Sequence, residues 1–141
     1  PWEKKQMKDT LEWLEKNNGP VISEPTKLTI ERGPKNPASG AVDVYVIEGM
    51  NYANHPQAPE DVADSLTIMF QSGVIPEVGI NGVTPEVLLE VIIDRFEGYQ
   101  SGPFACEEND RAIKGMRDAL KAIHDRIADR EARGVMNTMK K

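Results

Sequence analysis

The chain of 141 residues contains a single cysteine, Cys106, and two histidines, so it offers few of the ligands that zinc and iron–sulfur sites use. One cysteine excludes an internal disulfide and fits a reducing compartment. No run of 18 apolar residues is present, which argues against a membrane-spanning helix. No apolar stretch follows the charged residues at the start of the chain, so we expect a protein that is not exported and lies in the cytoplasm. The shortage of metal ligands leads us to expect no cofactor.

Positive charge is also in short supply. The chain has 17 Lys and Arg against 23 Asp and Glu, which gives a net charge of −6. Proteins that bind polymeric nucleic acid usually show a basic patch, so this function is disfavoured. The balance is uneven, however, because residues 106–141 hold nine Lys and Arg against seven Asp and Glu. An anion site is therefore expected in the last quarter of the chain.

Residues suited to catalysis do not form a recognisable set. Several carboxylates fall between residues 94 and 110, but no spacing among them singles out an acid–base pair. Cys106 begins a predicted helix, yet three acidic residues follow it within four positions and oppose a thiolate nucleophile. We therefore expect a protein that is not an enzyme.

The first half of the chain has mainly β character. Alternation of apolar and polar residues predicts strands over 26–31, 42–48 and 66–70, with Gly- and Pro-rich loops between them. Ser72-Gly73 is a plausible hairpin turn into Val74-Ile75. A short amphipathic helix is expected over residues 4–17. Residues 1–83 are thus predicted to contain an N-terminal helix and a small antiparallel β-domain.

The second half is predicted to be a helical hairpin with a C-terminal tail, over residues 84–141. Thr84-Pro85-Glu86 is a strong helix start, and the apolar residues of 85–97 cover so much of the circumference that we expect a central core helix. The longer helix, 106–131, has one narrow apolar seam that suits an antiparallel helix or another subunit. The seam consists of Ile113, Met116, Leu120, Ile123 and Ile127. The fold class is therefore α+β.

The best candidate for anion binding is a group of arginines near the end of the long helix. Arg126 and Arg130 are four residues apart and share one helical face, and Arg133 lies one turn further on. Two guanidinium groups on one face can each hold phosphate oxygens in bidentate fashion. The alternative is that these cations complement the helix dipole and pair with nearby acids such as Asp129. The pattern alone leaves both interpretations open.

The connection between the two helices supplies the other candidates. Tyr99 and Phe104 flank its Gly-containing turn, and Asn109 lies in the first turn of the long helix. An aromatic residue on a turn usually plugs the core, but it can also stack on a nucleobase. The asparagine could cap the helix or contact a base. These alternatives also stay open on the pattern alone.

Two long motifs give the chain a family resemblance. They read FQSGVIPEVGINGVTPEVLLEVIIDRFEGYQSGPFACEEND over 70–110 and HDRIADREARGVMNT over 124–138. In order and spacing they resemble small phage proteins of the cyclic-nucleotide sponge family, which counter Thoeris and CBASS defences by sequestering the signalling nucleotide. The similarity is greatest to the Thoeris-blocking members that bind glycocyclic ADP-ribose. It covers about half of the chain, residues 66–138.

The resemblance implies a small β-domain followed by a helical hairpin, assembled as a dimer or a hexamer in the cytoplasm of the infected bacterial host. It also implies that Tyr99 stacks on the base, that Asn109 makes a polar contact, and that Arg126 and Arg130 bind phosphates. The candidate ligand-binding residues are thus Tyr99, Phe104, Asn109, Arg126, Arg130 and Arg133. The tail departs from the family pattern at Met136 and Asn137, where an acid and a glycine are usual.

The separation of these residues along the chain has a consequence. Asn109 and Arg126 are 17 residues apart, about 26 Å along a helix at 1.5 Å per residue. A small ligand therefore needs a second subunit, with its helix antiparallel, to meet both groups. The main alternative is an oligomeric phage structural or assembly protein without a small-molecule ligand. A nuclease or phosphodiesterase that acts on the same nucleotides is disfavoured by the absence of a metal-ligand set.

Overall fold

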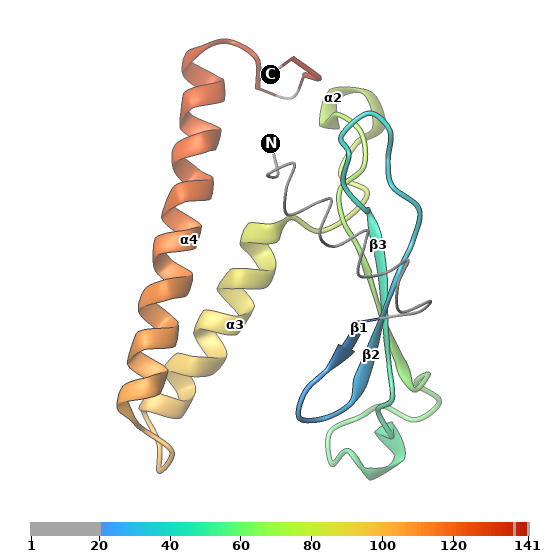
Figure 1. Ribbon diagram of the computed structural model, residues 1–141, viewed down its shortest axis with the longest axis vertical. Helices are drawn as coiled ribbons and strands as arrows, with labels where there is room; N and C mark the ends of the chain where they lie inside the picture. Colours follow the sequence, from blue (N-terminus) through green and yellow to red (C-terminus); the bar gives the residue numbers. More distant parts are fainter. Residues whose placement is uncertain (1–20, 137, 141) are drawn as a thin grey trace. The chain divides into compact units, whose positions relative to one another are not determined.

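The computed structural model describes residues 21–136 and 138–140, which form two compact units divided between Met69 and Phe70 (Figure 1). The first unit is a β-sheet and the second contains the helices. The α+β class and the order of sheet before helical hairpin are thus confirmed. The helix expected over 4–17 lies outside the described residues, and the domain boundary at residues 83 and 84 stays a prediction.

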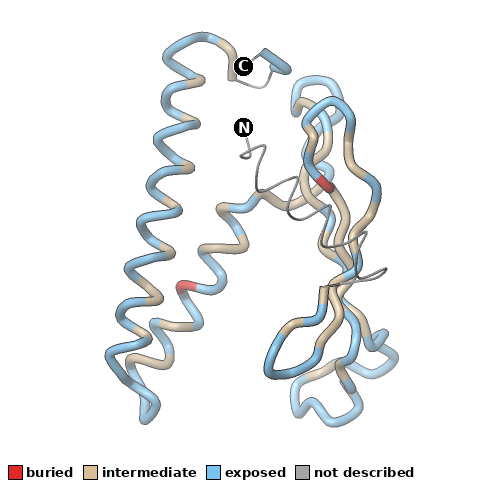
Figure 2. The backbone as a smooth tube through the Cα atoms, in the orientation of Figure 1, coloured by how far each residue is buried: buried red, intermediate tan, exposed pale blue. Residues whose placement is uncertain are grey.

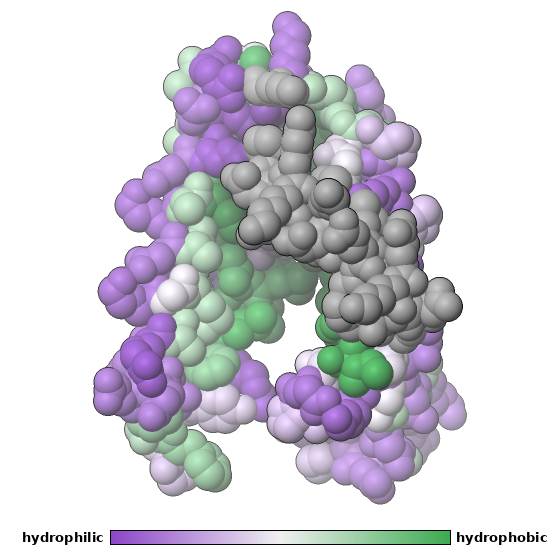
Figure 3. Space-filling model, viewed as in Figure 1, coloured by the Kyte–Doolittle hydropathy of each residue, from purple (hydrophilic) through white to green (hydrophobic). Residues whose placement is uncertain are grey.

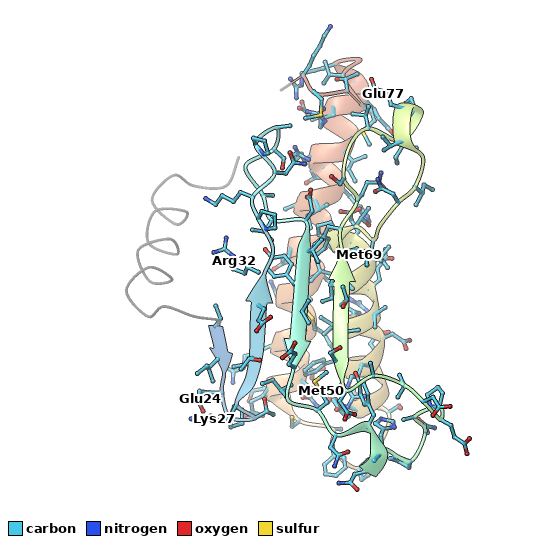
Figure 4. All side chains as sticks on the ribbon, turned by 90° about the vertical axis from the view of Figure 1, so that its right-hand side faces the viewer. Glu24, Lys27, Arg32, Met50, Met69 and Glu77 are labelled. Atoms are coloured by element: carbon cyan, nitrogen blue, oxygen red, sulfur yellow. The ribbon has the colours of Figure 1, made fainter. Side chains whose placement is uncertain are left out.

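The sheet of the first unit has four antiparallel strands in sequence order. The strands are β1 (Val21–Ser23), β2 (Leu28–Arg32), β3 (Val44–Glu48) and β4 (Ser65–Met69), with a short 3₁₀ helix, η1 (Tyr52–Asn54), between β3 and β4. Three of the strands fall where alternation predicts them. Strand β1 was not predicted, because it is only three residues long; it pairs with β2 through a tight turn. An ion pair between Glu24 and Lys27 lies at this turn (Figure 4).

The strand register gathers apolar side chains on one face of the sheet. Ile47 of β3 pairs with Ile30 of β2 and with Leu66 of β4, and the neighbouring Tyr45 pairs with Ile68. Side chains at paired positions share a face, so these residues form one apolar layer. Val42, just before β3, is 6% exposed. It is the one apolar residue that is buried among the described residues of this unit, and most of the sheet is only half-buried (Figure 2).

The loop over residues 70–83 belongs to the helical unit. Phe70 and Val83 form an isolated parallel bridge, which brings the two ends of the loop together. The expected hairpin at Ser72-Gly73 is wrong, because Val74 instead caps a single helical turn, α2 (Ile75–Val78). Pro76 explains the difference, since proline has no N–H for a strand ladder but fits the first turn of a helix.

The helical hairpin consists of α3 (Pro85–Gln100) and α4 (Glu107–Ala132), which pack against each other. An ion pair between Glu97 of α3 and Arg117 of α4 links the two helices. At 1.5 Å per residue α3 is about 24 Å long and α4 about 39 Å, so the C-terminal part of α4 extends past the start of α3 (Figure 1). The seam residues near that end of α4, Ile123 and Ile127, are half-buried.

The expectation that α3 is a fully covered core helix is wrong. Ile93 is 8% exposed, but Val91 is 61% exposed and Val87 and Ile92 are also exposed. The reason is that α4 covers one side of α3, whereas the apolar residues of α3 extend around most of its circumference. Figure 3 shows this apolar surface along the helical hairpin. Thr84 occupies the N-cap position as expected, but its side chain makes no capping hydrogen bond.

Candidate ligand-binding site

A shallow cavity of about 340 Å³, largely open to solvent, lies at the turn that joins α3 and α4, and it is lined by Tyr99, Phe104 and Asn109. Tyr99 comes from the last turn of α3, Phe104 from the connecting turn, and Asn109 from the first turn of α4. The sequence places the three residues within eleven positions, and the reversal of the chain brings them together. The structure thus unites three of the six candidate residues.

The Tyr99 ring is held in place by two neighbours on α3. The Phe96 ring meets it edge to face, with centroids 5.5 Å apart and an interplanar angle of 88°. The Arg95 guanidinium lies 5.1 Å from the centroid of Tyr99, within the range of a cation–π contact. By contrast, Phe104 is 75% exposed. The cavity therefore offers one constrained and one open aromatic surface to a planar group.

A glutamine that the sequence analysis missed organises the polar side of this cavity. The Gln100 side chain donates through Nε2 to the carbonyl of Cys106 at 2.9 Å and to Asp110 Oδ1 at 2.7 Å. Its Oε1 accepts from the backbone N–H of Cys106 at 3.0 Å and from Asn109 Nδ2 at 2.9 Å. Asn109 Nδ2 also donates to the Phe104 carbonyl at 3.0 Å. Gln100 lies within the motif over 70–110, but no periodicity singles it out, because its role depends on contacts across the turn.

The three candidate arginines lie at the opposite end of α4 and have different surroundings. Arg126 is exposed, and its side chain makes no hydrogen bond or ion pair with residues 21–136 and 138–140. Arg133 forms an ion pair with Asp129 at 2.9 Å, as the dipole-and-pairing alternative expects. The structure therefore does not bring the arginines to the aromatic cavity of the same chain.

Arg130 binds the C-terminal tail. Its Nη1 donates to the carbonyl of Lys140 at 2.7 Å, and its Nη2 donates to the carbonyls of Val135 and Thr138, each at 3.0 Å. The backbone reverses at Gly134, whose φ of 72° is in the left-handed region that glycine favours. A guanidinium has five N–H donors, and three of them are used in hydrogen bonds within residues 21–136 and 138–140.

The remaining charges on α4 form surface pairs along the helix. Lys114 donates to Asp118 at 2.8 Å, and this hydrogen bond, together with the charge of the carboxylate, raises the pKa of Lys114. Lys121 pairs with Asp125 at 2.7 Å. Exposed pairs of this kind contribute little to stability. Among the described residues there is no group of three His, Cys, Asp or Glu side chains placed to hold a metal ion, and no helix with the length and apolar character to cross a membrane.

Comparison with known proteins gives two consistent matches. Residues 62–128 match the model of the Acb2/Tad1 hairpin domain family. The chain is also similar to Thoeris anti-defense 1 from Bacillus phage SBSphiJ7, with 36% identity over 104 residues, which cover 73% of each protein. The family resemblance predicted from the sequence motifs is thereby confirmed. The matched span contains the whole cavity and most of α4, and the chain belongs to the Acb2/Tad1 hairpin domain family.

Proposed function

We propose that this protein is a phage anti-defence protein that binds and sequesters a cyclic ADP-ribose-type immune signal, without cleaving it. The family membership and the anti-defence name of the Bacillus phage relative support this role. By that analogy the ligand is glycocyclic ADP-ribose, and its removal prevents activation of a Thoeris effector in the cytoplasm of the infected bacterial host.

The observation on which the proposal chiefly depends is the cavity of Tyr99, Phe104 and Asn109. Two aromatic rings beside an amide are suited to a nucleobase, because the rings stack on its faces and the amide contacts its edge. Stacking of one base on an aromatic side chain contributes about 1–3 kcal/mol. A sequestering protein needs this affinity and no catalytic group.

The phosphates of the ligand are assigned to the arginines of a second copy of the chain. Asn109 and Arg126 are about 26 Å apart along α4, which is too far for one small nucleotide. In an antiparallel pair of α4 helices, the arginine end of one protomer reaches the cavity of the other. The half-buried seam of α4 and the exposed apolar residues of α3 provide surface for such an assembly. We therefore propose a homo-oligomer, a dimer or a hexamer, with shared sites.

Within these shared sites Arg126 has a guanidinium without a partner among residues 21–136 and 138–140. Arg130 uses three of its five donors on the described part of the tail, and we assign the other two to a phosphate. Arg133 is the weakest of the three candidates, because Asp129 already neutralises it. We nevertheless keep Arg133 as a candidate for phosphate binding, because it lies one helical turn beyond Arg130.

Calorimetry against a panel of cyclic ADP-ribose isomers and cyclic di- and trinucleotides tests the proposal. We expect binding of glycocyclic ADP-ribose, and recovery of the intact ligand after the protein is heat-denatured. Recovery of a cleaved product would instead show an enzyme. The exposed apolar residues of α3 also fit a phage assembly protein without a ligand, and no binding across the whole panel would favour that alternative.

A further inference from the structure

We infer that Gln100 is a positioning residue that fixes the orientation of the Asn109 amide, so that the cavity presents a hydrogen-bond acceptor and selects a nucleobase with an exocyclic amine. The inference depends on the proposed function in one respect, namely that the ligand is a nucleotide whose base enters this cavity. The orientation of Asn109 itself depends only on the contacts of the turn.

The backbone of Cys106 determines which way the Gln100 amide points. The N–H of Cys106 is a donor and must face Oε1 of Gln100, at 3.0 Å, while its carbonyl is an acceptor and must face Nε2, at 2.9 Å. A flipped Gln100 amide would place donor against donor and acceptor against acceptor. Asp110 Oδ1, which accepts from Nε2 at 2.7 Å, favours the same orientation. All four hydrogen bonds that a glutamine amide can form are thus used.

The orientation of the Gln100 amide in turn determines the orientation of the Asn109 amide. The Asn109 amide faces two acceptors, Oε1 of Gln100 at 2.9 Å and the Phe104 carbonyl at 3.0 Å. A side-chain amide nitrogen has two hydrogens, and both are therefore used. The Oδ1 atom has no hydrogen-bond partner within residues 21–136 and 138–140, and Asn109 lines the cavity. The group that the Asn109 side chain offers to a ligand is thus an acceptor alone.

An acceptor-only group distinguishes nucleobases by their exocyclic substituent. The amine of adenine can donate to Oδ1, whereas the carbonyl of hypoxanthine at the same ring position would oppose one oxygen to another. A site that leaves a polar group unpaired with the wrong ligand rejects that ligand strongly. The cavity should therefore favour glycocyclic ADP-ribose over its hypoxanthine analogue.

The test compares these two ligands by calorimetry, in the full chain and in two glutamine variants. We expect the wild type to bind the adenine ligand about 10–100-fold more tightly than the hypoxanthine analogue. Gln100→Met removes the group that orients Asn109 but keeps the side-chain length, so this ratio should fall towards one. Gln71→Met is the matched control, since the Gln71 side chain bonds Gly79 and Asn81 near the other end of α3. It should leave the ratio unchanged.

A double-variant comparison separates positioning from general support of the fold. In an Asn109→Leu background, Gln100→Met should not change the ratio further. If Gln100 only stabilises the turn, its replacement weakens the binding of both ligands equally. The ratio of the two affinities then stays at the wild-type value, which would overturn the inference. Equal affinity of the wild type for both ligands would overturn it too, while leaving the proposed function intact.

A measurement without ligand keeps the inference testable if the variants fold poorly. In the wild type, the Asn109 Nδ2 protons should exchange with water at least tenfold more slowly than those of Gln57, an exposed residue, in amide-resolved NMR. Exchange of the Asn109 protons at the rate of Gln57 would show that the amide rotates freely and would refute its fixed orientation. Slow exchange with no binding of either ligand would instead support the orientation and count against the proposed function alone.

Discussion

Alanine substitutions at Arg126 and Arg130 should have different consequences, because their guanidinium groups have different surroundings. Arg126 is exposed and makes no bond within the described part of the chain, so if the proposed site is right, Arg126→Ala removes only a contact to the ligand. A charge-assisted hydrogen bond contributes about 1.5–3 kcal/mol. At about 1.4 kcal/mol per factor of ten, the affinity should fall by roughly one to two decades, with little change in thermal stability.

Arg130→Ala should release the C-terminal tail in addition to weakening the binding of the ligand. The carbonyls of Val135, Thr138 and Lys140 lose the hydrogen bond from Arg130 in this variant, although that of Val135 still accepts from Thr138. A typical hydrogen bond contributes about 0.5–1.5 kcal/mol net, and the solvent-exposed ones lie at the low end of that range. We therefore expect a local destabilisation of about 1–3 kcal/mol, confined to residues 134–140. Hydrogen exchange over this segment should become roughly ten- to hundredfold faster.

The double variant Arg126→Ala/Arg130→Ala should bind glycocyclic ADP-ribose two to four decades more weakly, as measured by calorimetry. Lysine at both positions should recover part of this loss only, because an ammonium group cannot reproduce the bidentate fork. Light scattering provides the control, since the oligomer should persist. A stable, oligomeric double variant with wild-type affinity would remove both arginines from the binding site, and would leave Arg130 as a tail contact only.

Two further changes test the assembly and the helix. Leu120→Asp introduces a charge into the seam of α4, which should cost several kcal/mol and abolish both the oligomer in light scattering and ligand binding. A monomer that binds with full affinity would refute the shared site. Gly115→Ala should stabilise α4 by about 0.5–1 kcal/mol, because a Cβ at this position meets no atom within 4 Å. The melting temperature by circular dichroism should rise by about 1–4 °C, and a fall would indicate that this face is covered by another subunit.

The parts of the fold that could be predicted from the sequence are those governed by local patterns. Alternation marks β3, and the Thr-Pro-Glu start and the 3,4 spacing mark the two long helices. The proximity of Tyr99, Phe104 and Asn109 could also be anticipated, since six residues between two packed helices leave the flanking side chains no room to separate. These features depend on residues close together in the chain, so the sequence alone is enough to predict them.

The features that could not be predicted depend on contacts between residues with no characteristic spacing. Gln100 is a polar residue at the end of a helix, and only the path of the turn brings it to Cys106 and Asn109. The tail contacts of Arg130 depend in the same way on the reversal at Gly134. The exposure of Val91 was missed for another reason, because an apolar residue does not reveal which partner covers it.

The distance between the cavity and the arginines also affects how sequestration would depend on concentration. If each site requires the aromatic end of one α4 and the arginine end of another, a monomer lacks half of the contacts to the ligand. Ligand binding and assembly are then linked, so the ligand must strengthen the oligomer by the same factor by which the oligomer strengthens ligand binding. A ligand present at 100 times its dissociation constant would contribute about 2.7 kcal/mol to the assembled form. A protein built in this way would capture its proposed ligand most tightly when protein and ligand accumulate together, because each then favours the complete site.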